Sequence, residues 1–329
     1  MKRTLLLILT FVLSFINQIN AQLEVVGSDQ YGRIFDINYD PQTEDKIYAV
    51  TLGNHILEST DNGATWQILW SYPDSRASLR SLRILPGNRL SFYSTNTGTD
   101  KVNVLDISTL TLSQQLELPV PAGSDNQWIS AYSFYESGTD TALVLQGFGI
   151  GFANFAKVYY TTDGGKSWDE VYYNVDFNEV FPNNVAISPA DPEKLFILRG
   201  EGPTDIDGGL LTSTDAGQNW TEQMPQIRFQ AITFNPENPD DILLGTGIGY
   251  EGHTENLYRS IDGGATWNII PITWTDMTLD NINAIVYNPS DLNNIIVLEE
   301  NEIVITTDNF ATVQNYVYPG TDNIVIIMD

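Results

Sequence analysis

The 329-residue sequence contains no cysteine, two histidines, and only 15 lysine and arginine residues against 42 aspartate and glutamate residues. The lack of cysteine excludes disulfides and thiolate metal sites, and His55 and His253 alone form no histidine cluster. A net charge of −27 repels phosphate backbones and anionic headgroups, so we expect no nucleic-acid partner. The charge favours solubility, with binding of cations or a basic partner as the alternative.

Long apolar runs are absent after the first 21 residues. Lys2 and Arg3 form a basic segment, residues 5–16 are mostly apolar, and Ala21 ends a small-residue cleavage site. This pattern indicates a secretory signal peptide over residues 1–21, so we expect a secreted or cell-envelope protein. Cleavage removes two positive charges and changes the net charge from −27 to −29. No later segment approaches the roughly 18 apolar residues of a membrane span, so we expect a soluble monomer without membrane insertion.

One eight-residue pattern, Ser/Thr-x-Asp-x-Gly-x-Thr/Ser-Trp, recurs along the chain. Close copies occupy residues 59–66, 161–168, 213–220 and 260–267, and a divergent copy occupies residues 306–313. Each copy follows a short apolar segment and precedes another, which predicts a strand–turn–strand unit.

The spacing of the repeat predicts the architecture. The five aspartates of the pattern are separated by 102, 52, 47 and 46 residues, so a unit without the motif is expected near residue 106. A period of about 45–52 residues with four short strands is typical of β-propeller blades. We expect a single all-β propeller domain over residues 22–329, with six blades near residues 31–70, 79–118, 127–173, 182–223, 228–270 and 281–318.

Two terminal pieces, residues 22–27 and 322–328, remain outside these six units. They could form part of a seventh blade or brace a closed six-bladed ring, since propellers avoid exposed sheet edges. A third alternative is that the sequence stops where a further blade would begin. The sequence leaves all three alternatives, and hence six or seven blades, open.

The repeated turn resembles the Asp-box, or BNR repeat, of sialidases, sortilin-like receptors, xyloglucanases and photosystem assembly-factor propellers. The resemblance covers nearly the whole chain after the leader. In such a turn the aspartate can accept hydrogen bonds from backbone amides, glycine permits positive φ, and tryptophan supplies an apolar surface between blades. We therefore predict structural rather than catalytic roles for Asp61, Trp66, Asp163, Trp168, Asp215, Trp220, Asp262 and Trp267.

Strand direction assigns the loops to two faces. The first–second and third–fourth turns of every blade lie on one face, named here the turn face, and the other connections lie on the opposite, long-loop face. The long-loop face receives residues 146–155, 200–208, 247–255 and 272–277, and long loops on a rigid scaffold commonly bind ligands. The predicted binding residues are Phe148, Phe152, Asp205, Asp207, Tyr250, Glu251 and Trp274.

The sequence contains no recognisable catalytic constellation. A sialidase needs an arginine triad, and residues 31–35 have phenylalanine where the family signature Arg-Ile-Pro has proline. Asp205, Asp207 and Glu251 could provide paired carboxylates, but 42 acidic residues make chance pairs easy. Asp205 and Asp207 also resemble a fragment of a calcium site without its remaining ligands, so we expect no cofactor, with calcium as the alternative.

These observations predict a non-catalytic propeller that binds a protein, peptide or glycan on its long-loop face. The alternative is a glycan-active hydrolase or lyase of the sialidase-like or xyloglucanase-like kind.

Overall fold

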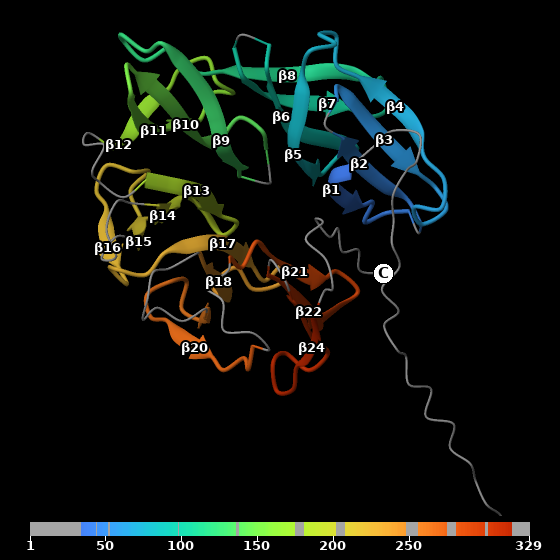
Figure 1. Ribbon diagram of the computed structural model, residues 1–329, viewed down its shortest axis with the longest axis vertical. Coiled ribbons are helices and arrows are strands. Elements are labelled where there is room, and N and C mark those ends of the chain that lie inside the picture. The colour runs from blue at the N-terminus through green and yellow to red at the C-terminus, as the bar shows by residue number, and fades with distance from the viewer. Residues whose placement is uncertain are drawn as a thin grey trace, which may run out of the picture.

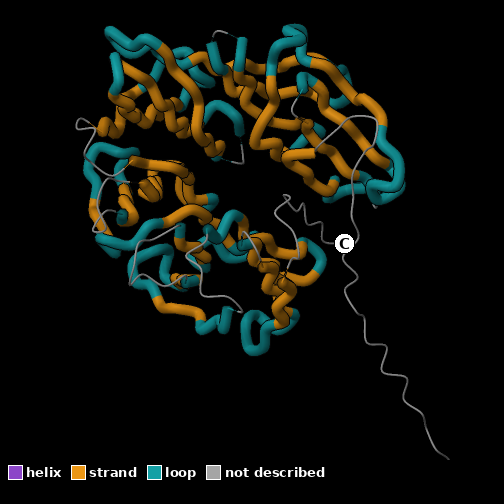
Figure 2. The backbone as a smooth tube through the Cα atoms, viewed as in Figure 1, coloured by secondary structure: helices purple, strands orange, loops and turns teal. Residues whose placement is uncertain are grey.

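The computed structural model describes residues 34–317 apart from 44, 52, 98, 136–137, 175–180, 202–207, 248–255, 275–280 and 300–301. The described chain consists of 24 strands with turns between them. They form six four-stranded antiparallel sheets, each built from four consecutive strands. Figure 1 shows these sheets arranged as blades around a common axis, and Figure 2 shows strands and loops without a helix in this part of the chain. The described residues accordingly contain no helix that could cross a membrane.

The blades follow one another along the chain, each beginning with its innermost strand. Blades 1 to 3 consist of β1 (Ile34–Tyr39), β2 (Ile47–Thr51), β3 (His55–Ser59), β4 (Gln67–Ser71); β5 (Ser78–Leu85), β6 (Arg89–Thr95), β7 (Lys101–Asp106), β8 (Thr111–Glu117); and β9 (Asn126–Phe134), β10 (Ala142–Ile150), β11 (Ala153–Thr161), β12 (Asp169–Asn174). Blades 4 to 6 consist of β13 (Phe181–Ser188), β14 (Asp191–Glu201), β15 (Gly209–Ser213), β16 (Thr221–Gln223); β17 (Phe229–Phe234), β18 (Ile242–Thr246), β19 (Leu257–Ser260), β20 (Asn268–Ile270); and β21 (Ala284–Asn288), β22 (Asp291–Leu298), β23 (Glu302–Thr306), β24 (Gln314–Val317).

Among the described residues the six predicted four-stranded blades are confirmed, including the motif-free blade near residue 106. The predicted leader, and the terminal pieces 22–27 and 322–328, lie outside the described residues.

The hydrophobic core lies between the blades. Along β10, Ala142 and Val144 pack toward blade 2, whereas Leu143 and Leu145 pack toward blade 4, and all four are fully buried. Because successive side chains of a strand point to opposite faces, a blade that is covered on both sides needs an uninterrupted apolar run. Full burial of one such aliphatic side chain contributes about 1.5–3 kcal/mol. This explains why the middle strands read as continuous apolar segments in the sequence.

The five repeated turns, named here the aspartate turns, share one hydrogen-bond pattern. In blade 5 the Ser260 hydroxyl donates to Asp262 Oδ1 (2.7 Å) and accepts from the Gly264 amide (2.7 Å). Asp262 also accepts from the Thr266 amide (2.8 Å) and from the Thr266 hydroxyl (2.6 Å). The two residues after the aspartate have positive φ, 69° at Gly263 and 91° at Gly264, which glycine adopts without steric cost.

The divergent copy in blade 6 forms the same turn. Thr306 and Thr312 make the corresponding contacts to Asp308 at 2.7–2.9 Å. Here the two positive-φ residues are Asn309 (56°) and Phe310 (69°) in place of glycine. The polar contacts of the turn are therefore sufficient to hold a non-glycine residue in this unfavourable region.

In every blade one backbone hydrogen bond joins the two turns of the turn face. The amide donors of the third–fourth turns are Asn62, Ile107, Gly164, Ala216, Gly263 and Asn309, and the acceptors of the first–second turns are the carbonyls of Asp45, Asn88, Asp140, Glu193, Asp240 and Asn293, at 2.9–3.0 Å. Blade 2 makes this bond without an aspartate turn. The bond places both turns on one face, as strand direction predicts.

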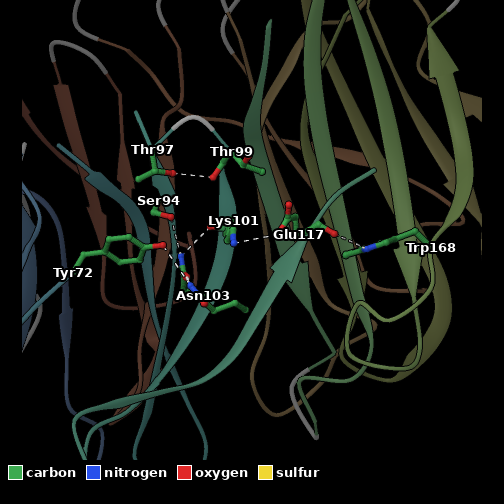
Figure 3. A network of polar contacts seen from close by, with 9 residues as sticks. Tyr72, Ser94, Thr97, Thr99, Lys101, Asn103, Glu117 and Trp168 are labelled. Atoms are coloured by element: carbon green, nitrogen blue, oxygen red, sulfur yellow. Dashed lines mark hydrogen bonds and ion pairs between the residues drawn. The ribbon is translucent and has the colours of Figure 1, made fainter. Parts of the chain in front are cut away.

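The tryptophan that ends an aspartate turn reaches the preceding blade. Trp168 Nε1 donates to the Glu117 carbonyl (2.9 Å), as Figure 3 shows, and Trp220 Nε1 donates to the Val171 carbonyl (2.7 Å). Trp267 makes the equivalent contact to the Gln223 side chain (2.8 Å). In blade 1, Trp66 Nε1 is buried and has no acceptor among the described residues. Trp168, Trp220 and Trp267 thus add a directional polar contact to the apolar packing between blades.

A comparison of two tryptophan variants measures how much the inter-blade hydrogen bond contributes to the free energy of unfolding. We expect Trp220→Phe to lower the free energy of unfolding by about 0.5–1.5 kcal/mol beyond the packing loss, because it leaves the Val171 carbonyl without its donor. Trp66→Phe loses similar apolar area but no such hydrogen bond, so its unfolding free energy should fall less. Urea unfolding of both variants measures the difference, and an equal loss in the two would contradict the assignment.

The aspartate turns also predict that the folded protein loses stability at low pH. Hydrogen bonds, chiefly from the Thr266 hydroxyl and amide, lower the pKa of Asp262 from 3.8 to about 2. A lowered folded-state pKa gives stability that is complete above about pH 4 and is lost as the pH falls toward about 2. We expect the urea midpoint to fall over this window, and to fall less steeply in Asp262→Asn. The exposed-carboxylate variant Glu237→Gln serves as control, and an unchanged slope in Asp262→Asn would refute the expectation.

Candidate functional site

The six innermost strands surround the axis, and side chains of one blade bind the backbone of the next. Asp36 on β1 accepts from the Ser81 amide on β5 (2.7 Å), and Asn38 donates to the Leu82 carbonyl (2.8 Å). The same type of contact joins blades 4 and 5, where Asn184 donates to the Gln230 carbonyl (3.1 Å). Each contact falls at a β-bulge of the receiving strand, where the ladder leaves backbone groups unpaired. Side-chain-to-backbone hydrogen bonds therefore join the innermost strands of blades 1 and 2 and of blades 4 and 5.

Burial raises the pKa of Asp36, although the amides of Ser81 and Leu82 and the nearby guanidinium groups of Arg83 and Arg80 oppose this change. A carboxyl group with a raised pKa can serve as a general acid. Asp36, however, already binds the bulge of β5, so its position is that of a tether between blades 1 and 2.

A cavity of about 640 Å³ opens on the turn face, beside the axis. Its lining comes from blades 1, 2, 3 and 6 and combines aromatic, aliphatic and polar side chains, including Tyr39, Asp40, Tyr48, Arg83, Phe134 and Val286. The guanidinium of Arg83 lies 5.4 Å from the centre of the Tyr132 ring, a distance that favours a cation–π interaction. Asp40 accepts a hydrogen bond from the Tyr48 hydroxyl (3.2 Å). The sequence prediction had placed the candidate site on the other face.

Three of the seven predicted binding residues lie among the described residues, and each has a different environment. Phe148 is 2% exposed and stacks on Phe155 with ring centres 5.6 Å apart, so it supports its neighbours instead of facing solvent. Phe152 is fully exposed at the end of a hairpin. Trp274 is partly buried against the core between blades 5 and 6. The remaining four, Asp205, Asp207, Tyr250 and Glu251, lie outside the described residues.

The prediction of a long loop over residues 146–155 is wrong. The segment forms the ends of β10 and β11, which pair without interruption from Ala142↔Thr161 to Ile150↔Ala153. Only Gly151 and Phe152 form the turn, and Gly151 has the positive φ of 61° that a two-residue hairpin requires. The repeated glycines suggested a loop, but Gly147 and Gly149 belong to the extended strand.

These two glycines leave room for side chains of the neighbouring strand. A Cβ atom on Gly147 would lie 2.3–2.5 Å from three indole atoms of Trp128, and one on Gly149 would lie 2.4 Å from Asn126 Oδ1. Trp128 and Asn126 are the direct cross-strand partners of these glycines on β9. The sequence pattern alone does not identify Trp128 as a candidate, because its place opposite a strand glycine is visible only once the register is known.

The described residues contain no group of three or more histidine, aspartate or glutamate side chains arranged to hold a metal ion. The calcium prediction concerned Asp205 and Asp207, which are not among them.

No protein-family profile matches the sequence. The chain is 23% identical over 270 residues to a xyloglucanase of Hypocrea jecorina, which covers 70% of this chain and 32% of the relative. It is 24% identical over 289 residues to a xyloglucanase of a Paenibacillus species, covering 75% of this chain and 27% of the relative. The chain thus spans about a third of the length of these curated relatives.

Solved structures show the same fold. The GH74 xyloglucanase of Xanthomonas campestris superposes with a TM-score of 0.59 at 18% identity, over 89% of this chain and 48% of that one. YCF48 from Cyanidioschyzon merolae superposes with a TM-score of 0.52 at 13% identity, over 92% of this chain and 89% of that one. At these identities the structures establish a β-propeller. The sequence relatives are glycan hydrolases, so the comparisons favour the hydrolase alternative over the non-catalytic prediction.

Proposed function

We propose that this protein is an exported, glycan-active β-propeller whose ligand is a neutral polysaccharide such as xyloglucan, and that its aspartate turns are Asp-box repeats. The observation that supports the proposal is the sequence similarity to xyloglucanases over 70–75% of the chain. Export rests on the leader-like residues 1–21.

The charge of the chain supports a neutral ligand. With a net charge of −27, the protein repels polyanions at long range, whereas an uncharged polysaccharide meets no such barrier. Recognition of an uncharged sugar then depends on aromatic surfaces and on hydrogen-bonding side chains, and the lining of the turn-face cavity contains both.

Hydrolysis of a glycosidic bond requires two carboxyl groups about 5–9.5 Å apart. On the turn face, Asp40 is a cavity-lining carboxylate. On the long-loop face the proposed carboxylates are Asp205, Asp207 and Glu251. The two faces therefore offer competing positions for an acidic site, and substitution can distinguish them.

Purified protein should be retarded in native gels that contain xyloglucan and should release reducing ends from it. A polygalacturonate gel should not retard it. We expect the triple variant Asp205→Asn/Asp207→Asn/Glu251→Gln to lose reducing-end release by about 100-fold or more, because general acid–base groups contribute about 10²–10⁴-fold. Thermal melting of each variant controls for folding.

Three outcomes would change the proposal. Loss of release in Asp40→Asn, with the triple variant active, would move the reaction to the turn face. Retardation without release from any neutral glycan would reduce the function to glycan binding. Neither retardation nor release would refute glycan activity and favour a protein or peptide ligand.

A further inference from the structure

The strongest unassigned feature of the molecule is the side chain of Trp128. It lies at the start of β9, the innermost strand of blade 3, and therefore where the axial wall meets the long-loop face. The other end of the same strand, Phe134, lines the cavity of the turn face. Trp128 is thus separated from that cavity by the length of the strand.

Trp128 is packed differently from Trp168 and Trp220, which lie against the cores between blades. It is half-buried, yet among the described residues it is not one of the hydrophobic side chains packed against the cores between blades. No other described ring stacks on it, and its indole N–H has no acceptor among the described residues. A large aromatic side chain that contributes little to a core is available for a ligand.

The backbone of β10 fixes the position of this indole. Three indole atoms lie 2.3–2.5 Å from the place of a Cβ on Gly147, so the ring rests against a strand that has no side chain there. Gly147 has no positive φ, so its backbone conformation is open to any residue. Space for Trp128 is the physical reason that the position suits glycine.

Two carboxamides lie in the cross-strand row next to the indole, on the same face of the blade. Asn126, Gly149 and Asn154 form one cross-strand row, adjacent to the row of Trp128, Gly147 and Ala156. Both asparagines are exposed, and neither side chain has a hydrogen-bond partner among the described residues. Each amide can donate two hydrogen bonds and accept two. Asp125, the charged residue next to Asn126, is engaged by the Gly151 amide (2.7 Å).

We propose that Trp128, Asn126 and Asn154 form a binding platform for a pyranose ring of a neutral glycan. The apolar C–H face of a pyranose complements an indole, and its hydroxyl groups complement unpaired carboxamides. The platform contains no charged side chain, which matches an uncharged sugar on a strongly acidic protein. This inference rests on the proposed glycan function and adds the position and chemistry of one subsite.

The test is calorimetric titration of the whole protein with a β-1,4-linked glucose hexamer, and separately with a galacturonic acid hexamer. We expect the glucose hexamer to bind more tightly. Trp128→Ala should weaken it about tenfold or more, as truncation of a central aromatic does in other interfaces. Trp128→Phe should retain binding within about threefold, because a smaller aromatic face remains.

Two further variants separate the platform from general instability. Gly147→Ala keeps the tryptophan but places a methyl group 2.3 Å from its indole, so it should weaken binding nearly as much as Trp128→Ala. The control Gly138→Ala adds a methyl group with nothing within 4 Å and should bind like the wild type. The exposed pair Asn126→Ala/Asn154→Ala should fold normally and weaken binding severalfold.

The outcomes distinguish this inference from the proposed function. If the wild type binds the glucose hexamer and Trp128→Ala, Gly147→Ala and the asparagine pair all bind it within twofold, the platform is refuted and the glycan function stands. Tighter binding of the galacturonic acid hexamer would refute the proposal that the ligand is a neutral glycan. If the wild type binds neither hexamer nor xyloglucan, both proposals fail.

Discussion

The hydrogen bond between the two turns of each blade is the constraint that all six blades share. It has nearly the same length, 2.9–3.0 Å, in all six blades, and it fixes the end of the third–fourth hairpin against the end of the first–second hairpin. In five blades an aspartate turn orients its donor, because serine or threonine and aspartate together satisfy the amides of a tight reversal. Blade 2 shows that the bond is the shared feature and the motif one way to make it.

The contacts between blades build on these fixed turns. A tryptophan at the end of the turn is held where its indole N–H can reach the preceding blade, as in Trp168 and Trp220. On the same face, Arg259 binds Asp241 through two hydrogen bonds and Asn309 of the next blade through a third. Apolar clusters fill the space between the blades, and the polar contacts add directional links across it. The turn face therefore carries the repeated polar contacts between blades.

The difference between local turn signals and long-range strand pairing explains which parts of the structure could be predicted. The aspartate spacing is a local, repeated signal, so it located six blades and even the motif-free blade around Ile107. The segment around Gly147 and Gly149 was misjudged because glycine-rich sequence is typical of loops. Its true role depends on the cross-strand register with Trp128 and Asn126, and this register is a property of pairing between distant residues. Trp128 was missed for the same reason: within β9 alone it resembles any strand aromatic.

The platform proposed on the long-loop face consists of strand residues, Trp128, Asn126 and Asn154. Trp128 and the neighbouring amides lie on paired strands, which lowers the ordering cost at binding and favours a weakly interacting ligand such as a sugar. The most direct measurement is an experimental structure of the protein soaked with a β-1,4-linked glucose hexamer. The account predicts a glucose ring against the Trp128 indole, within hydrogen-bond distance of Asn126 or Asn154. A hexamer seated in the turn-face cavity beside Arg83, with Trp128 uncovered, would contradict it.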